Sequence, residues 1–161
     1  MSESGGREET RAWRLFLQTH ATVLDVLEQE LRDRLGLPLS WYEVLLHLSR
    51  APEGRQRMSD LARSVLLSKS GLTRLIDRME GAGLIERSHC PSDRRGTFAS
   101  LTPRGKEAFE EAAPLHLEGI RRHFLGPLTP EERDTLADLL ARVLEPASES
   151  ATSAGTVAAA G

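Results

Sequence analysis

The stretch from Ser68 to Thr102 constrains the fold of this chain more than any other part of its 161 residues. Serine commonly caps the first turn of a helix, and Ser68 stands at the start of such a turn. Apolar residues then recur at three- and four-residue steps, which predicts a helix with one buried stripe. Glycine readily adopts the left-handed conformation that ends helices, so we expect the stop at Gly81 and Gly83. The stripe consists of Leu72, Leu75, Ile76 and Met79.

A β-hairpin is predicted directly after this helix. Two short strand-like runs, 84–88 and 97–101, flank a segment that is rich in proline, serine, aspartate and glycine, all of them turn formers. Arg94 and Arg95 lie near the predicted tip, and paired arginines suit the narrow, electronegative minor groove of DNA. Asp93 is placed to hold one guanidinium by a charge-assisted hydrogen bond.

A helix-turn-helix is predicted before the hairpin. Ser40 and Glu43 have the spacing of a capping box and predict a helix as far as about Arg50. Residues 55–57 read as a short edge strand, and Ser59 is expected to cap the next helix. That helix and the one after Ser68 are joined tightly, which is the arrangement of a helix-turn-helix.

Three longer helices flank this lobe. The first spans 7–35 and carries an apolar stripe too long for a small core to cover alone, so we expect part of it to face a partner subunit. The second begins at Thr102-Pro103, and Pro114 should kink or break it. The third begins at Thr129-Pro130 with another capping box and is expected to end at Pro146.

These elements predict a mostly α-helical winged helix-turn-helix chain with a small β-hairpin wing. We expect a flexible N-terminus over 1–6, a single domain over 7–145 and a disordered tail over 146–161, where the composition is small and polar. Within the domain, 39–102 form the DNA-binding lobe. Residues 7–38 and 103–145 are the flanking helices.

The exposed side of the second helix of the helix-turn-helix is the candidate site. The N-terminal residues of such a recognition helix reach base edges in the major groove. The candidate contacts to bases or phosphates are Ser68, Lys69, Ser70, Thr73 and Arg74, with Arg78 expected at phosphates or in a structural contact. Ordinary surface positions on a helix are the alternative.

Charge is distributed unevenly along the chain, although the formal net charge is −3. The segment from Arg50 to Lys106 contains 12 lysines and arginines but only 6 aspartates and glutamates, and the remainder of the chain is acidic. A basic module on an acidic scaffold is typical of a DNA reader, although uneven surface charge alone is the simpler alternative.

The order of elements, together with four motifs, resembles the MarR family of winged helix-turn-helix regulators over about residues 11–145. The resemblance implies a homodimer built from the first helix and the last two. It also implies that Arg95 enters the minor groove, that Asp93 buttresses it and that Arg94 contacts phosphate. The motifs are Thr73-Arg74-Leu75-Ile76-Asp77-Arg78, Gly83-Leu84-Ile85-Glu86-Arg87, Asp93-Arg94-Arg95 and Leu101-Thr102-Pro103-Arg104-Gly105.

Family members are mostly repressors, some are activators, and many are released from DNA by small aromatic ligands. Others respond to oxidation or to metals. The resemblance leaves the ligand open and requires no cofactor. A dimer of helix-turn-helix proteins reads two half-sites, so we expect a pseudo-palindromic operator.

Other classes find less support in the sequence. Cys90 could sense oxidation, and the five histidines could bind metal, but none of them shows close metal-ligand spacing. No catalytic motif of the common enzyme classes is present. No run is apolar enough to cross a membrane and no signal segment is found, so we expect a cytoplasmic protein. A dimeric winged-helix adaptor that binds proteins remains the alternative function.

Overall fold

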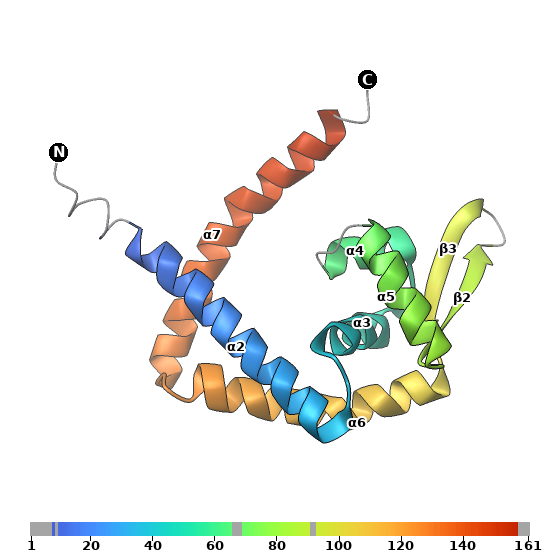
Figure 1. Cartoon of the computed structure of the whole chain (residues 1–161). Coiled ribbons are helices and arrows are strands. Elements are labelled where there is room, and N and C mark those ends of the chain that lie inside the picture. The colour runs from blue at the N-terminus through green and yellow to red at the C-terminus, as the bar shows by residue number, and fades with distance from the viewer. Residues whose placement is uncertain (1–7, 9, 66–68, 91–92, 158–161) are drawn as a thin grey trace. The chain divides into compact units, whose positions relative to one another are not determined.

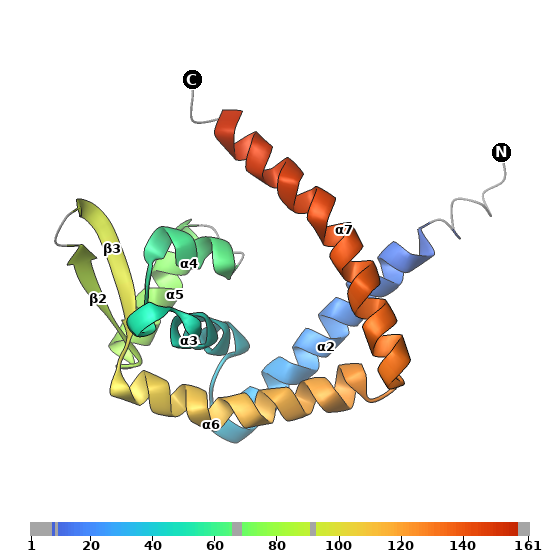
Figure 2. The same cartoon turned by 180° about the vertical axis from the view of Figure 1, so that it is seen from behind.

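The computed structural model describes residues 8, 10–65, 69–90 and 93–157, without the side chains of residues 69, 89–90, 93–96 and 146–157. This part of the chain is mostly helical and carries one small antiparallel sheet (Figures 1 and 2). It forms two compact units, of which the first ends at Ile120 and the second begins at Arg121. The predicted fold class is confirmed.

The first unit holds the helix-turn-helix and the hairpin. In both views the lobe that contains α3, α4, α5 and the hairpin lies along one part of α6, while α2 crosses another part (Figures 1 and 2). Its elements are α2 (Arg11–Leu35), α3 (Leu39–Arg50), η1 (Pro52–Gly54), β1 (Arg55–Arg57), α4 (Met58–Ser64), α5 (Lys69–Gly81), β2 (Ile85–Cys90), β3 (Asp93–Leu101) and α6 (Pro103–Ile120).

Two predicted helix ends are confirmed at glycines. Gly36 follows α2 with φ of 63° and donates its backbone N–H to the carbonyl of Arg32. Gly83 follows α5 with φ of 73°. Residues other than glycine rarely adopt such left-handed conformations, so these positions suit glycine.

Two predicted helix caps are wrong. No side chain at the start of α3 forms a cap, and Ser40 lies inside the helix, which begins at Leu39. The Glu28 carboxylate of α2 takes this role instead and accepts the Leu39 N–H at 2.5 Å. Ser59 likewise lies inside α4, where its hydroxyl is 3.3 Å from the Asp60 carboxylate.

Prolines interrupt the helices less than expected. α6 continues through Pro114, so the predicted break is absent. In the second unit, η2 (Arg121–Leu125) is followed by α7 (Pro130–Val157). A stop at Pro146 with a disordered tail was expected, and the helix instead continues to Val157. Proline removes one helical hydrogen bond, which can bend a helix without ending it when the flanking residues favour helix.

The predicted capping box at the start of α7 is confirmed. Glu132 accepts the Thr129 N–H at 2.8 Å, and the Thr129 hydroxyl accepts the Glu132 N–H at 3.3 Å. The Thr102 hydroxyl serves α6 in a related way. It accepts the Gly105 N–H at 3.0 Å and donates to the Gly83 carbonyl at 2.7 Å.

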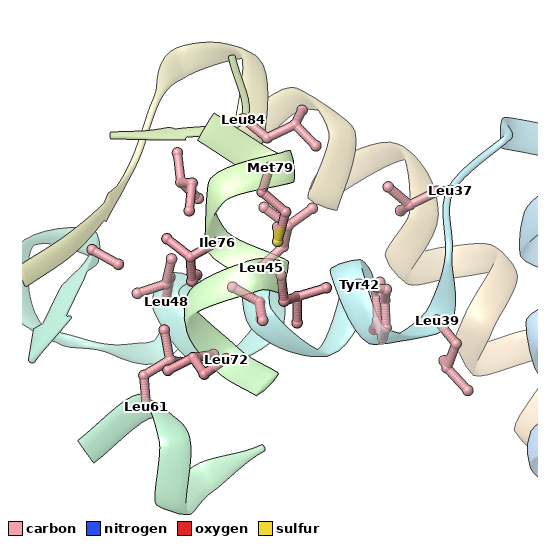
Figure 3. Packing of buried hydrophobic residues seen from close by; sticks show 14 of the residues in the cluster. Leu37, Leu39, Tyr42, Leu45, Leu48, Leu61, Leu72, Ile76, Met79 and Leu84 are labelled. Carbon is pink, nitrogen blue, oxygen red and sulfur yellow. The ribbon is translucent and has the colours of Figure 1, made fainter. Parts of the chain in front are cut away.

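The hydrophobic core of the first unit forms around α3 and α5 (Figure 3). Leu45 and Leu48 of α3 face Leu72 and Ile76 of α5, and Leu61 of α4 closes one side. Each of these five side chains is at most 1% exposed. Complete burial of such a side chain contributes roughly 1.5–3 kcal/mol, so this cluster fixes which face of α5 remains outside.

Candidate nucleic-acid interface

Helix α5 presents the predicted contact residues on one exposed face. Leu72, Ile76 and Met79 hold the opposite face in the core. The exposed positions lie three, four and eight residues apart, and this spacing places side chains on one side of a helix. They are Ser70, Thr73, Arg74 and Arg78. Ser68 lies outside the described residues, as does the side chain of Lys69.

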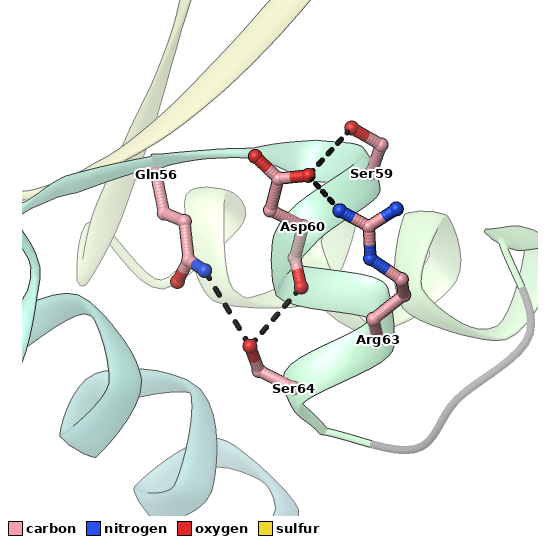
Figure 4. A network of polar contacts seen from close by, with 5 residues as sticks. All are labelled: Gln56, Ser59, Asp60, Arg63 and Ser64. Atoms are coloured by element: carbon pink, nitrogen blue, oxygen red, sulfur yellow. Dashed lines mark hydrogen bonds and ion pairs between the residues drawn. The ribbon is translucent and has the colours of Figure 1, made fainter. Parts of the chain in front are cut away.

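Helix α4 is tied to strand β1 by a short polar chain (Figure 4). Gln56 of β1 lies 3.4 Å from the Ser64 hydroxyl, which donates to the backbone carbonyl of Asp60 at 3.1 Å. The Asp60 carboxylate accepts from Arg63 at 2.6 Å. Of these contacts, the one between Gln56 and Ser64 links the first helix of the helix-turn-helix to the sheet, and the other two lie within α4.

The sheet has the strand order β1-β3-β2, with both pairs antiparallel. Ala99 of β3 lies between Gln56 and Arg87 and is fully buried, so this row faces the helices. The next row, which contains Phe98, therefore points to the other face, because side chains alternate along a strand. The hairpin thus has an inner face on the lobe and an outer face.

Arg87 connects this inner face to α5. Its Nη2 donates to the Asp77 carboxylate at 2.5 Å and to the Thr73 carbonyl at 3.3 Å. Its backbone N–H donates to the Glu80 carboxylate at 3.0 Å. Asp77, which belongs to the Thr73–Arg78 motif, therefore makes a structural contact with the wing. Arg87 itself was recognised only as part of a motif, since sequence does not show which helical carboxylates face it.

The wing is longer than predicted. β2 pairs with β3 from Ile85↔Leu101 to His89↔Thr97, and then shifts register so that Cys90 pairs with Asp93. The expected turn residues 93–96 therefore belong to β3, and residues 94–96 lie between the two paired positions Asp93 and Thr97. The side chains of Asp93, Arg94 and Arg95 lie outside the described residues, and so does that of Cys90.

Two arginines of β1 form a cationic surface with an aromatic ring, and sequence reasoning did not identify them. The guanidinium carbons of Arg55 and Arg57 lie 5.5 and 5.4 Å from the centre of the Phe98 ring. Cations within about 6 Å of a ring centre are attracted to its face. Arg55 also pairs with Glu53 at 2.8 Å. The alternation of Arg55 and Arg57 was the signal available in the sequence, whereas Phe98 lies on another strand and only the pairing of β1 with β3 brings it close.

Comparison with known proteins agrees with this arrangement. A model of the MarR family matches residues 35–96. The HTH-type transcriptional regulator YkoM of Bacillus subtilis is 32% identical over 136 residues, which cover 83% of this chain and 86% of the relative. This chain belongs to the MarR family.

Solved structures of MarR-family regulators share the fold closely. AbsC of Streptomyces coelicolor matches with a TM-score of 0.82 and 39% identity, over 92% of this chain and 97% of AbsC. Sco3205 of the same organism, solved in complex with DNA, matches with a TM-score of 0.81 and 34% identity, over 86% and 87% of the two chains. α5 and the β2–β3 hairpin are accordingly the recognition helix and the wing of this MarR-family chain.

Other kinds of site receive little support in this MarR-family chain. Among the described residues, no group of three or more histidine, cysteine, aspartate or glutamate side chains could hold a metal ion. A shallow pocket at the helix-turn-helix is lined by Met58, Ser59, Leu72 and Thr73. None of the described helices is long and apolar enough to cross a membrane.

An aromatic cluster joins α6 to α3. The rings of Tyr42 and His116 lie 4.3 Å apart, and Phe109 stacks on Tyr42 at 5.8 Å. Burial lowers the pKa of His116, and it raises the pKa of Tyr42 against the opposing effect of Arg50. The Nδ1 atom of His116 is buried without a hydrogen-bond partner in the described part of the chain.

Proposed function

We propose that this MarR-family protein represses transcription by binding a pseudo-palindromic operator in double-stranded DNA as a homodimer. The exposed face of α5 is the observation that carries this proposal. Ser70, Thr73 and Arg74 lie together on its N-terminal half, opposite a fully buried stripe. Hydroxyl and guanidinium groups suit base edges and phosphates in a major groove.

The same proposal assigns the other predicted DNA contacts. Ser68 and Lys69 belong to the start of the recognition helix, and Arg78 contacts phosphate. In the wing, Arg95 enters the minor groove, Asp93 buttresses it and Arg94 contacts phosphate. The DNA-bound structure of the related Sco3205 supports a nucleic-acid partner for this lobe. We assign residues 39–102 to this lobe, and 7–38 with 103–145 to dimerisation.

Exposed apolar side chains outside the lobe support a homodimer. On α2, Trp13 is 59% exposed and stacks on Phe16 with ring centres 5.9 Å apart. On α7, Val143 and Leu144 are 72% and 68% exposed. Large exposed apolar patches commonly mark protein interfaces. A second copy of the chain would cover these surfaces.

A small aromatic ligand completes the proposed mechanism. It would release DNA by favouring a dimer whose recognition helices no longer match successive major grooves. Such a ligand must bind the two states of the dimer with different affinity. We assign no catalytic step to this protein. We propose that it acts in the cytoplasm, where operator DNA is accessible.

The test is footprinting on the DNA upstream of the protein's own gene, repeated across salt concentrations and with a panel of aromatic acids. A salt-sensitive footprint over two half-sites supports the proposal. Arg74→Ala should cost about 1–3 kcal/mol of operator affinity. The control Arg142→Ala removes an exposed cation of α7 and should leave affinity unchanged. Absence of a specific footprint on any fragment of the surrounding genome would contradict the proposal.

A further inference from the structure

The inner face of the wing is fastened to the recognition helix at two levels. Leu84 and Ile85, which are 6% and 2% exposed, anchor the base of the hairpin in the core. Side chains on one face of a strand recur every second residue, so Arg87 is the next inward residue toward the tip. Its cross-strand neighbour Ala99 is fully buried but small. The contact with α5 at this second level is therefore made by a polar group.

The Arg87 side chain reaches three groups of α5. Nη2 donates to the Asp77 carboxylate at 2.5 Å and to the Thr73 carbonyl, and Nη1 lies 3.6 Å from the Glu80 carboxylate. Asp77 and Glu80 are three residues apart, which places both carboxylates on one side of the helix. The guanidinium is planar and rigid, so contacts in several directions fix its orientation.

Burial distinguishes this ion pair from the other pairs of the lobe. The side chain of Arg87 is 27% exposed, whereas that of Arg63, paired with Asp60 on α4, is 78% exposed. An exposed pair of the second kind contributes little to structure. Arg87 instead joins two separate elements, and its backbone N–H adds a second link to Glu80.

We propose that Arg87 is a positioning residue for DNA binding, which sets the angle of the wing against the recognition helix. Docked this way, the wing tip meets a minor groove while α5 occupies the adjacent major groove. Arg87 itself touches no DNA in this proposal. The proposal rests on the DNA-binding function argued above and adds a specific internal contact to it.

A double-mutant cycle on operator affinity tests the proposal. Arg87→Met keeps an unbranched apolar stem in place of the arginine stem and removes the guanidinium with its polar contacts, and should lower affinity about tenfold, or about 1.4 kcal/mol. In that background Arg95→Ala should cost less than about twofold, because the wing no longer reaches its groove, while Arg74→Ala should keep its full effect. Arg63→Met is the control and should leave the effect of Arg95→Ala unchanged.

The result that overturns the proposal is Arg87→Met with unchanged affinity, or equal loss from Arg95→Ala in both backgrounds. A wild-type chain without operator binding, or an Arg95→Ala variant with full affinity in the wild-type background, would instead contradict the proposed function. Asp77→Asn removes the carboxylate from the other side of the contact and replaces Arg87→Met if that variant does not fold.

Hydrogen exchange of the free protein gives a second readout that needs no DNA. Arg87→Met should speed exchange in residues 85–101 and leave exchange in α3 and α6 unchanged, because only the attachment of the wing is lost. Unchanged exchange in the wing would overturn the proposal whatever the affinity data show.

Discussion

Gly105 of α6 packs directly against the backbone of Leu84, which precedes the wing. A Cβ atom at this position would lie 1.9 Å from the Leu84 carbonyl oxygen, and this oxygen also accepts the Thr102 N–H at 3.2 Å. Because the obstacle is backbone that is itself hydrogen-bonded, it cannot move aside cheaply. Gly105→Ala should therefore lower the free energy of unfolding by about 1–3 kcal/mol, measured by urea denaturation.

Gly81→Ala is the matched control for this prediction. Gly81 ends α5, and a Cβ there would have nothing within 4 Å. Alanine favours helix over glycine, so this variant should be neutral or slightly stabilising. Equal destabilisation by both substitutions would show that the close contact at Gly105 is not the cause.

His116 should make stability depend on pH. Burial lowers the pKa of His116 below the usual 6.5. Its buried Nδ1 atom has no partner among the described residues that could accept a hydrogen bond from an N–H at this position. The unfolded chain therefore takes up the proton more readily than the folded chain. Stability should be highest above pH 6.5 and fall as the pH drops through that value.

The measurement is the urea midpoint at about pH 7.5 and about pH 5.5. His116→Phe keeps an aromatic ring against Tyr42 and should remove part of the loss at the lower pH. His123→Phe, on η2, should behave as the wild type. A pH dependence that His116→Phe leaves unchanged would assign the effect to other groups.

At the scale of helices and strands, local sequence patterns predicted which elements form and in what order they follow along the chain. The 3.6-residue periodicity identified the buried face of α5, and Gly36 and Gly83 marked two ends, because these signals depend on neighbours in sequence. Caps supplied by a distant residue were missed. Glu28 precedes Leu39 by eleven residues, so no local motif connects its carboxylate to the start of α3.

The start of α3 allows the two cap assignments to be compared directly. Glu28→Gln keeps a hydrogen-bond acceptor, whereas Glu28→Ala removes it and should destabilise the chain by about 0.5–2 kcal/mol. Ser40→Ala should change stability by less than about 0.5 kcal/mol, since Ser40 lies within the helix. Thermal or urea unfolding of the three variants measures this. A larger cost at Ser40 than at Glu28 would restore the capping box that sequence spacing predicted.

The candidate site divides in the same way. Which residues of α5 face outward followed from periodicity, and the structure places Ser70, Thr73, Arg74 and Arg78 there. The partners of Arg87 could not be predicted, because they depend on how a strand docks on a helix. Similarly, whether Leu139 and Leu140 are buried depends on what covers α7, and in the single chain they are 49% and 39% exposed. Apolar periodicity predicts a buried face without saying which molecule buries it.

At the scale of the whole molecule, the last prediction concerns the surface through which two copies of the chain form the proposed homodimer. Leu27 is 3% exposed and lies where α2 approaches Gly119 of α6 within the same chain, so a charge there would disturb the monomer. Leu144 is 68% exposed and tests association alone. Leu144→Asp adds a charge that a dimer would have to bury, which is costly when unpaired. It should shift the protein to monomers in sedimentation and weaken operator binding at low protein concentration.

Arg142→Ala removes an exposed charge from the same helix and should leave the dimer intact, which would show that a substitution on α7 does not disturb association in itself. Circular dichroism should show unchanged helix content for both variants, because neither side chain is buried in the single chain. A Leu144→Asp protein that remains dimeric and binds its operator normally would place the interface elsewhere, with the stacked Trp13 and Phe16 of α2 as the next surface to alter. Loss of DNA binding without loss of the dimer would instead mean that α7 acts on the lobe by another route.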